Sequence, residues 1–160
     1  MSSHESPGAT PDATPETTRT PPSQPLSPAQ ILELQRRALE VAHHAYAPYS
    51  HFRVGAALLL EQPSDIVTGC NVENASYRLT VCAEQAAIAA AVGLYGPTIR
   101  IRAITVTTLN GVACQPCGAC RQTIQEFSGP DTLIIYPSAP NTFSQTTIGE
   151  ILPAAFHLKS

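Results

Sequence analysis

The chain has 160 residues, 43% of them hydrophobic, which suits one folded domain with a core of useful size. Its net charge of −3, with nine Lys and Arg and no run of basic residues, argues against binding a nucleic-acid backbone. No apolar run is as long as a membrane span, and the N-terminus lacks the basic start and apolar stretch of a secretory signal, so we expect a cytoplasmic protein.

Residues 1 to 25 differ in composition from the rest of the chain. Fifteen of them are Ser, Thr or Pro, and few are apolar. Such a segment buries too little surface to offset the entropy lost on ordering, so we predict a disordered tail. Residues 26 to 160 then form the folded domain.

A helix is predicted directly after this tail. Residues 27–30 read Ser-Pro-Ala-Gln, which are the residue types of an N-cap, a first helical position and a capping box. Leu26 and Ile31 are placed for a hydrophobic staple. Apolar residues recur at helical spacing through Ala45, and Pro48 stops the helix.

Strands and helices are both predicted in the remaining chain. Apolar, β-branched stretches predict strands at 54–60, 66–71, 99–107 and 132–136. Helices are expected at 82–94, at 116–127 and, shorter, from Thr147 towards Leu152. Helices interspersed with apolar strands indicate an α/β layer fold around one sheet.

The five cysteines are the most informative residues. They cannot all pair within one chain, and in a reducing compartment cysteines are more often metal ligands or buried small side chains. Cys82 begins one predicted helix, while Cys117 and Cys120 lie three apart at the start of another, nearly on one face. Helix N-termini favour thiolate over thiol. Three thiolates with an open fourth position describe a catalytic zinc site, and Glu84 can point at the same place as Cys82.

Cys114 leaves two other interpretations open. It forms a Cys-x-x-Cys-x-x-Cys run with Cys117 and Cys120, and an iron–sulfur cluster built on that run would need Cys70 as a fourth ligand. A closed structural zinc site using Cys114 is the stronger alternative. It leaves Glu84 without a role.

Several segments follow one another in an order seen in a known family. They read Pro-Tyr-Ser-His-Phe at 48–52, Val-Gly-Ala-Ala-Leu at 54–58, Gly-Cys-Asn-Val-Glu-Asn-Ala-Ser-Tyr at 69–77, Cys-Ala-Glu at 82–84, Pro-Cys-Gly-Ala-Cys-Arg-Gln at 116–122 and Leu-Pro-Ala-Ala-Phe at 152–156. From about Leu26 to Phe156 the chain resembles the small zinc-dependent cytidine deaminases of the three-cysteine, homotetrameric type. The resemblance implies a three-layer α/β/α fold with a mixed central sheet of about five strands.

The resemblance also implies an activity and a metal. The reaction is hydrolytic deamination of cytidine and 2′-deoxycytidine to uridine and 2′-deoxyuridine, with release of ammonia, as in pyrimidine salvage. Zn²⁺ would be held by Cys82, Cys117 and Cys120, and zinc-bound hydroxide would attack C4 while Glu84 shuttles protons.

Five further positions match residues that bind substrate in this family. Asn71 and Glu73 would bind the ribose 3′-hydroxyl, Phe52 would line the pyrimidine pocket, and the backbone of Ala83 would contact the base. Phe156 would pack on the base, often from a neighbouring subunit. As an isolated aromatic it would otherwise be expected to bury against its own domain.

Gln85 departs from the commoner family pattern, which has arginine after the catalytic glutamate. Three thiolates, Zn²⁺ and hydroxide together carry a negative load that is costly in a partly buried site. An arginine beside the sulfurs would withdraw charge, as groups around a metal site commonly do, whereas glutamine brings no positive charge. The helix N-termini, Arg78 or Arg121 would have to compensate.

Three other functions are compatible with the zinc motif. A nucleic-acid-editing deaminase should show a basic strand-binding surface and stacking aromatics, which this chain lacks. An aminonucleoside-antibiotic deaminase shares the motif, but the segments at 71–75 and 152–156 favour cytidine. A non-enzymatic zinc-binding module would release no ammonia. We therefore expect a small-molecule nucleoside as substrate, with no nucleic acid and no membrane as partner.

Overall fold

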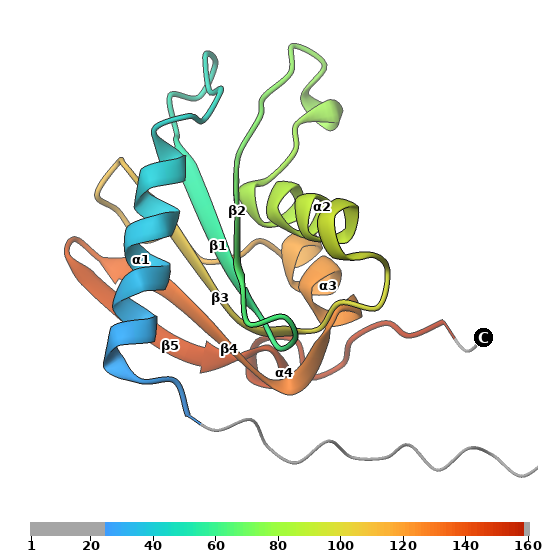
Figure 1. Ribbon diagram of the computed structural model, residues 1–160. Helices are drawn as coiled ribbons and strands as arrows, with labels where there is room; N and C mark the ends of the chain where they lie inside the picture. The colour runs from blue at the N-terminus through green and yellow to red at the C-terminus, as the bar shows by residue number, and fades with distance from the viewer. Residues whose placement is uncertain (1–24, 159–160) are drawn as a thin grey trace, which may run out of the picture.

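A five-stranded mixed sheet forms the centre of the computed structural model, which describes residues 25–158 (Figure 1). Apart from Pro25, the expected disordered tail lies outside the described residues. In the order β2-β1-β3-β4-β5, the sheet consists of β1 (Val54–Leu60), β2 (Ile66–Cys70), β3 (Ile101–Thr108), β4 (Ser128–Ala139) and β5 (Thr142–Thr147).

Helices cover both faces of this sheet. They are α1 (Pro28–Ala42), α2 (Ala83–Tyr95), α3 (Gly118–Glu126) and α4 (Ile148–Ile151), with a short 3₁₀ helix, η1 (Tyr77–Leu79), before α2. Helix α1 lies on one face, and α2, α3 and α4 lie on the other (Figure 1). The predicted three-layer α/β/α architecture is therefore confirmed. None of the helices in residues 25–158 has the length and hydrophobicity needed to cross a membrane.

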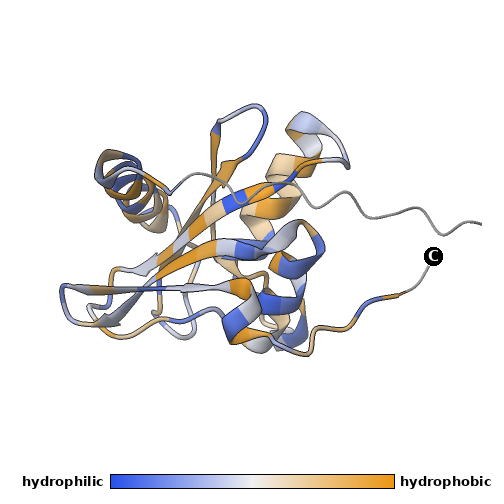
Figure 2. Cartoon of the chain, turned by 90° about the horizontal axis from the view of Figure 1, so that it is seen from below, coloured by the Kyte–Doolittle hydropathy of each residue, from blue (hydrophilic) through white to orange (hydrophobic). Residues whose placement is uncertain are grey.

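Strand β1 divides the interior into two cores. Its residues alternate between the faces, so Leu58 and Leu60 pack with α2, α3 and α4 while Ala57 and Leu59 pack beneath α1. All four side chains are almost fully buried. The strands are largely hydrophobic where they pass between the helical layers (Figure 2). This pattern explains why residues 54–60 read as a continuous apolar run rather than as alternating polar and apolar residues.

The strand directions bring two helix starts to one edge of the sheet. Both β2 and β3 are antiparallel to β1, so they run in the same direction, and β4 is parallel to β3. The carboxyl ends of β2 and β3 therefore lie on the same side of the sheet. From there the chain continues into α2 after β2 and into α3 after β3. The N-termini of these two helices therefore meet on one face of the sheet.

The first helix begins as the sequence predicts. The Ser27 hydroxyl accepts from the Gln30 backbone N–H at 3.3 Å, and the Gln30 side chain accepts from the Ser27 N–H at 2.9 Å. The helix ends at Ala42, so the expected extension through Ala45 was wrong. Apolar spacing persists to Ala45 because that residue is also buried, although it lies outside the helix.

Strand β5 was missed among the predicted elements. Its sequence, Thr-Phe-Ser-Gln-Thr-Thr, is mostly polar, and all six of its residues are exposed or half-buried. It lies at the edge of the sheet and pairs antiparallel with β4 alone. An edge strand has little apolar periodicity to signal it, because it buries little of either face.

Two glycines allow helices to approach the sheet closely. A Cβ on Gly55 would lie 2.0 Å from the Ala38 carbonyl oxygen of α1, and a Cβ on Gly69 would lie 2.3 Å from the Ala87 nitrogen of α2. Both neighbours are backbone atoms that cannot rotate away. These glycines therefore set how near α1 and α2 stand to β1 and β2.

We expect Gly69→Ala to lower the free energy of unfolding by about 1–3 kcal/mol, because α2 must shift to admit the methyl group. Gly93→Ala is the control: that glycine lies within α2 with no atom near its would-be Cβ, and alanine should stabilise the helix by about 0.5–1 kcal/mol. Urea midpoints measured with excess zinc compare the two. Equal midpoints for both variants would contradict the role of Gly69 in helix packing.

Candidate functional site

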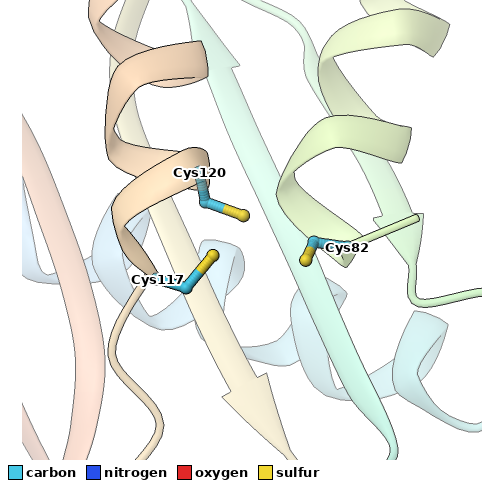
Figure 3. A group of neighbouring side chains, drawn as sticks. All are labelled: Cys82, Cys117 and Cys120. Atoms are coloured by element: carbon cyan, nitrogen blue, oxygen red, sulfur yellow. The ribbon is translucent and has the colours of Figure 1, made fainter. Parts of the chain in front are cut away.

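Three cysteine sulfurs gather between the starts of α2 and α3. The Sγ atoms of Cys82, Cys117 and Cys120 all lie within 4.8 Å of one another. Their side chains face one another from the two helices (Figure 3). Cys120 is buried, Cys82 is half-buried and Cys117 is exposed, so the cluster is reachable from solvent on one side. Of the cysteines expected to bind metal, the structure brings all three together.

Each helix start is built around a ligand. Cys82 is the N-cap of α2, and its carbonyl accepts from the Ala86 N–H at 3.0 Å. Cys117 is the N-cap of α3, and its carbonyl accepts from the Arg121 N–H at 2.9 Å. Cys120 lies in the first turn of α3. The cluster therefore lies at the N-terminal ends of two helices, where the first N–H groups have no partner within the helix and the helix dipole is positive.

The segment between β2 and α2 ties the cluster to the sheet. Val72 and Val81 form an antiparallel bridge, with both N–H···O distances at 2.9 Å. The Glu73 N–H donates to the Tyr46 carbonyl at 2.8 Å. The bridge fixes Cys82, which follows Val81, next to the Asn71–Glu73 stretch.

Glu84 is enclosed beside the sulfurs. Its residue is 4% exposed, and it occupies the first turn of α2 with Cys82 as the N-cap. Burial raises the pKa of its carboxyl above the ordinary value, although its own backbone N–H and the Cys120 side chain hydrogen-bond to it and act in the opposite direction. A carboxyl shifted upwards in this way is suited to take up and give back protons.

The thiols of the cluster influence one another. A hydrogen bond from Cys120 lowers the pKa of Cys82 to about 7, against the opposing effects of burial and of the Glu84 charge. The same interaction with Cys82 raises the pKa of Cys120. Cys82 is therefore the thiol of this pair that ionises first.

The two remaining cysteines lie outside this cluster. Burial, followed by the charges of Glu84 and Cys82, raises the pKa of Cys114 to about 12. Burial also raises the pKa of Cys70. Within residues 25–158 the grouping that could hold a metal contains neither of them. The geometry therefore favours the three-cysteine site over a structural site built with Cys114 or an iron–sulfur cluster that adds Cys70.

Asn71 and Glu73 contact the loop that carries Phe52. The Asn71 side chain donates to the Phe52 carbonyl at 2.9 Å and accepts from the Val54 N–H at 2.8 Å. Glu73 accepts from the Tyr49 N–H at 2.9 Å and also hydrogen-bonds to Ser50. The Ser50 hydroxyl is the largest cause lowering the pKa of Glu73, which therefore stays ionised. Both residues are buried and Phe52 is half-buried.

The Phe156 ring is exposed, although the sequence alone would favour its burial against its own domain. It is 69% exposed. Its backbone is held by Gln122 of α3, which donates to the Phe156 carbonyl at 2.8 Å and accepts from its N–H at 3.1 Å. These two hydrogen bonds hold the backbone of the segment after α4 against α3. They do not involve the Phe156 ring, which stays in solvent.

Arg121 is engaged away from the sulfurs. Its guanidinium donates to the Pro116 carbonyl at 2.9 Å and to the Ile151 carbonyl at 3.1 Å, which joins the ligand loop to α4. Arg78 lies exposed in η1. Gln85 is half-buried in the first turn of α2 and makes no side-chain hydrogen bond to the described residues. The positive ends of the α2 and α3 dipoles therefore remain beside the cluster. Within residues 25–158 the histidines are all exposed and lie outside the group that could hold a metal: His43, His44, His51 and His157.

Some contacts around the site carried no sequence signal. Asn110 holds the loop around Phe52, yet Asn-Gly at 110–111 reads simply as a turn. Gln122 belongs to the family motif, but its partner Phe156 lies 34 residues away. Such contacts depend on which segments become neighbours in space.

The donor set suits zinc, because thiolate sulfur is a preferred ligand and three protein ligands leave a position open for catalysis. With the buried Glu84 beside it on an α/β fold, the cluster defines the class of zinc-dependent hydrolases. Residues 28–136 match the family described as the cytidine and deoxycytidylate deaminase zinc-binding region. The chain belongs to this deaminase family, and zinc is its cofactor.

Curated relatives and solved structures agree with this assignment. The chain is 42% identical to a cytidine deaminase of Mycobacterium tuberculosis, covering 78% of this chain and 88% of that protein. It is 39% identical to one from Halalkalibacterium halodurans, covering 77% and 91%. A crystal structure of cytidine deaminase from Burkholderia pseudomallei shares 39% identity and a TM-score of 0.71, covering 78% of this chain and 98% of that chain. The five-stranded sheet and its helices thus match a solved family fold.

Alanine at Cys82, Cys117 or Cys120 should remove zinc, because each substitution deletes one of three ligands. Cys70→Ala and Cys114→Ala are the controls and should retain a full complement of metal. Elemental analysis of purified variants, with circular dichroism to check folding, measures this. Zinc lost from Cys114→Ala but kept in Cys82→Ala would instead indicate a structural site.

Proposed function

We propose that this enzyme hydrolyses cytidine and 2′-deoxycytidine to uridine and 2′-deoxyuridine, releasing ammonia, in pyrimidine salvage. The observation that carries the proposal is a buried Glu84 beside three sulfurs that lie within 4.8 Å of one another. Three unpaired cysteines in one site also suit a reducing compartment, so we place the enzyme in the cytoplasm. Ammonia release from cytidine by protein carrying stoichiometric zinc tests the activity. A zinc-loaded protein that releases none would be a binding module.

Glu84 is the proton carrier in this proposal. When bound, zinc would supply hydroxide at neutral pH by lowering the pKa of its water. Glu84 takes the proton that the water gives up and delivers it to N3 of the pyrimidine, which makes C4 electrophilic. After addition at C4, the same carboxylate takes the proton of the new C4 hydroxyl and passes it to the departing amine, which leaves as ammonia while C4 becomes the carbonyl of uridine. Burial of Glu84 raises its pKa and so supports both proton uptake and proton return.

Substrate contacts come from segments at the same edge of the sheet. Phe52 lines the base pocket, Asn71 and Glu73 bind the ribose 3′-hydroxyl, and the Ala83 backbone contacts the base. The bridge between Val72 and Val81 supports this assignment, because it links the ribose-binding stretch to Cys82. The side chains of Asn71 and Glu73 are already fixed by protein hydrogen bonds, so they meet the sugar at little entropic cost.

Glu84→Gln should reduce kcat by about 10²–10⁴-fold while zinc content and fold remain intact, because glutamine cannot carry the protons. Glu126→Gln is the matched control, since Glu126 is exposed at the end of α3. Steady-state kinetics with cytidine and zinc analysis of both variants provide the comparison. Near-normal turnover of a zinc-loaded Glu84→Gln protein would show that another group moves the protons.

We also propose that the enzyme is a homotetramer and that Phe156 reaches the base bound in a neighbouring subunit. Its exposed ring and clasped backbone support this role. Exposed apolar side chains on the loops beside the site also suit subunit contacts: Tyr46, Val72, Tyr77, Leu79 and Val81.

Sedimentation velocity should therefore give the mass of four chains for both the full chain and a version lacking residues 1 to 25. The truncation should leave turnover unchanged, because the folded domain begins at residue 26. A fully active monomer would refute the tetramer. Loss of assembly on truncation would assign the first 25 residues to the interface.

A further inference from the structure

The residues just before β1 lie between the ends of two other strands. In the sheet, β1 has β2 on one side and β3 on the other, and it runs antiparallel to both. The C-terminal ends of β2 and β3 therefore flank the segment 51–53. Asn71 directly follows β2, and Asn110 stands two residues after β3. One asparagine thus reaches this segment from each side.

The two asparagines make the same pattern of bonds on successive residues. Asn71 bonds the carbonyl of Phe52 and the N–H of Val54. Asn110 donates from Nδ2 to the His51 carbonyl at 3.1 Å and accepts at Oδ1 from the Arg53 N–H, also at 3.1 Å. Each carboxamide joins a carbonyl to the N–H two residues later, as a neighbouring strand would. Together they extend the hydrogen bonding of the sheet to residues 51–53, which precede β1 in the chain.

Neighbouring groups hold the Asn110 side chain in this orientation. The Thr108 hydroxyl lies 3.1 Å from Asn110 Oδ1 and 2.9 Å from the Arg53 carbonyl, and it accepts from the Asn110 N–H at 3.2 Å. Only this orientation of the carboxamide sets a donor against the His51 carbonyl and an acceptor against the Arg53 N–H. The side chain is therefore specified by its surroundings although it is exposed.

The clasped segment contains a backbone conformation that needs support. His51 has a φ of 57°, in the left-handed region that residues other than glycine rarely adopt. Its N–H donates to the Ala47 carbonyl at 3.1 Å, and its own carbonyl accepts from Asn110. Without Asn110, His51 loses the partner of its carbonyl and is free to relax towards negative φ. Phe52, the next residue, would move with it.

We propose that Asn110 is a positioning residue for deamination, which fixes the backbone on both sides of Phe52 and so sets where the Phe52 ring stands in the nucleoside pocket. The inference rests on the proposed function, in which Phe52 lines that pocket. Asn110 itself touches neither substrate nor metal. It acts on binding of the base through Phe52, so its loss alters KM and leaves kcat and zinc in place.

A double-mutant cycle on Phe52 and Asn110 tests this. Asn110→Ala should raise KM for cytidine about 3- to 10-fold, with kcat within about twofold of wild type and zinc content unchanged. Phe52→Ala should raise KM on its own. The double variant should match Phe52→Ala, because Asn110 has no effect once the ring is absent. Asn110→Asp should be at least as impaired as Asn110→Ala, because its second oxygen faces the His51 carbonyl.

Ser144→Ala is the control, since it removes one hydrogen bond, to the exposed Ser138, within the β4–β5 hairpin and should leave KM unchanged. Additive effects of Asn110→Ala and Phe52→Ala on KM, or an unchanged KM in Asn110→Ala, would overturn the positioning role. So would a loss of zinc or of kcat in Asn110→Ala. Absence of cytidine turnover in the wild-type enzyme would reject the proposed function, and the inference would fall with it. Active wild type with an additive cycle rejects the inference alone.

Discussion

The structure depends on one constraint: three cysteine sulfurs from two separate helices must stand within 4.8 Å of one another. The common direction of β2 and β3 satisfies this constraint, because the carboxyl ends of both strands then lie on the same side of the sheet. Placing α2 and α3 on one face brings Cys82 opposite Cys117 and Cys120 (Figure 3). Gly69 of β2 lets α2 pack directly on the sheet, and this close contact fixes the distance between α2 and β2.

The same arrangement manages the charge of the site. Thiolates repel one another, and a buried cluster of them is costly unless positive groups face it. Here the sulfurs lie at the N-terminal, positive ends of both helices, while Arg121 bonds backbone carbonyls instead. Placement of Glu84 in the first turn of α2 then puts a shielded carboxyl beside the metal ligands. The start of α2 thus carries both a metal ligand and the carboxyl that we propose as the proton carrier.

Polar side chains around the site mostly hold main chain rather than one another. Asn71 and Asn110 clasp the segment before β1, Glu73 holds the loop at 49–50, and Gln122 holds the backbone of Phe156. A carboxamide suits this task because it offers a donor and an acceptor in one plane, as a peptide group does. The loops at the edge of the sheet are therefore fixed although they lack regular secondary structure.

The sequence predicts most elements and marks Cys82, Cys117, Cys120 and Glu84 as candidates for one site, because capping boxes, β-branched runs and cysteine spacing are local patterns. Ser27 and Gln30 form the predicted box, and Cys82 and Cys117 are both N-caps. Only the tertiary structure decided that Cys114 stays outside the cluster, that β5 pairs with β4, and that Asn110 and Gln122 reach residues 57 and 34 positions away. These outcomes depend on strand order and direction, which no local pattern encodes, because they follow from how distant segments bury their apolar faces together.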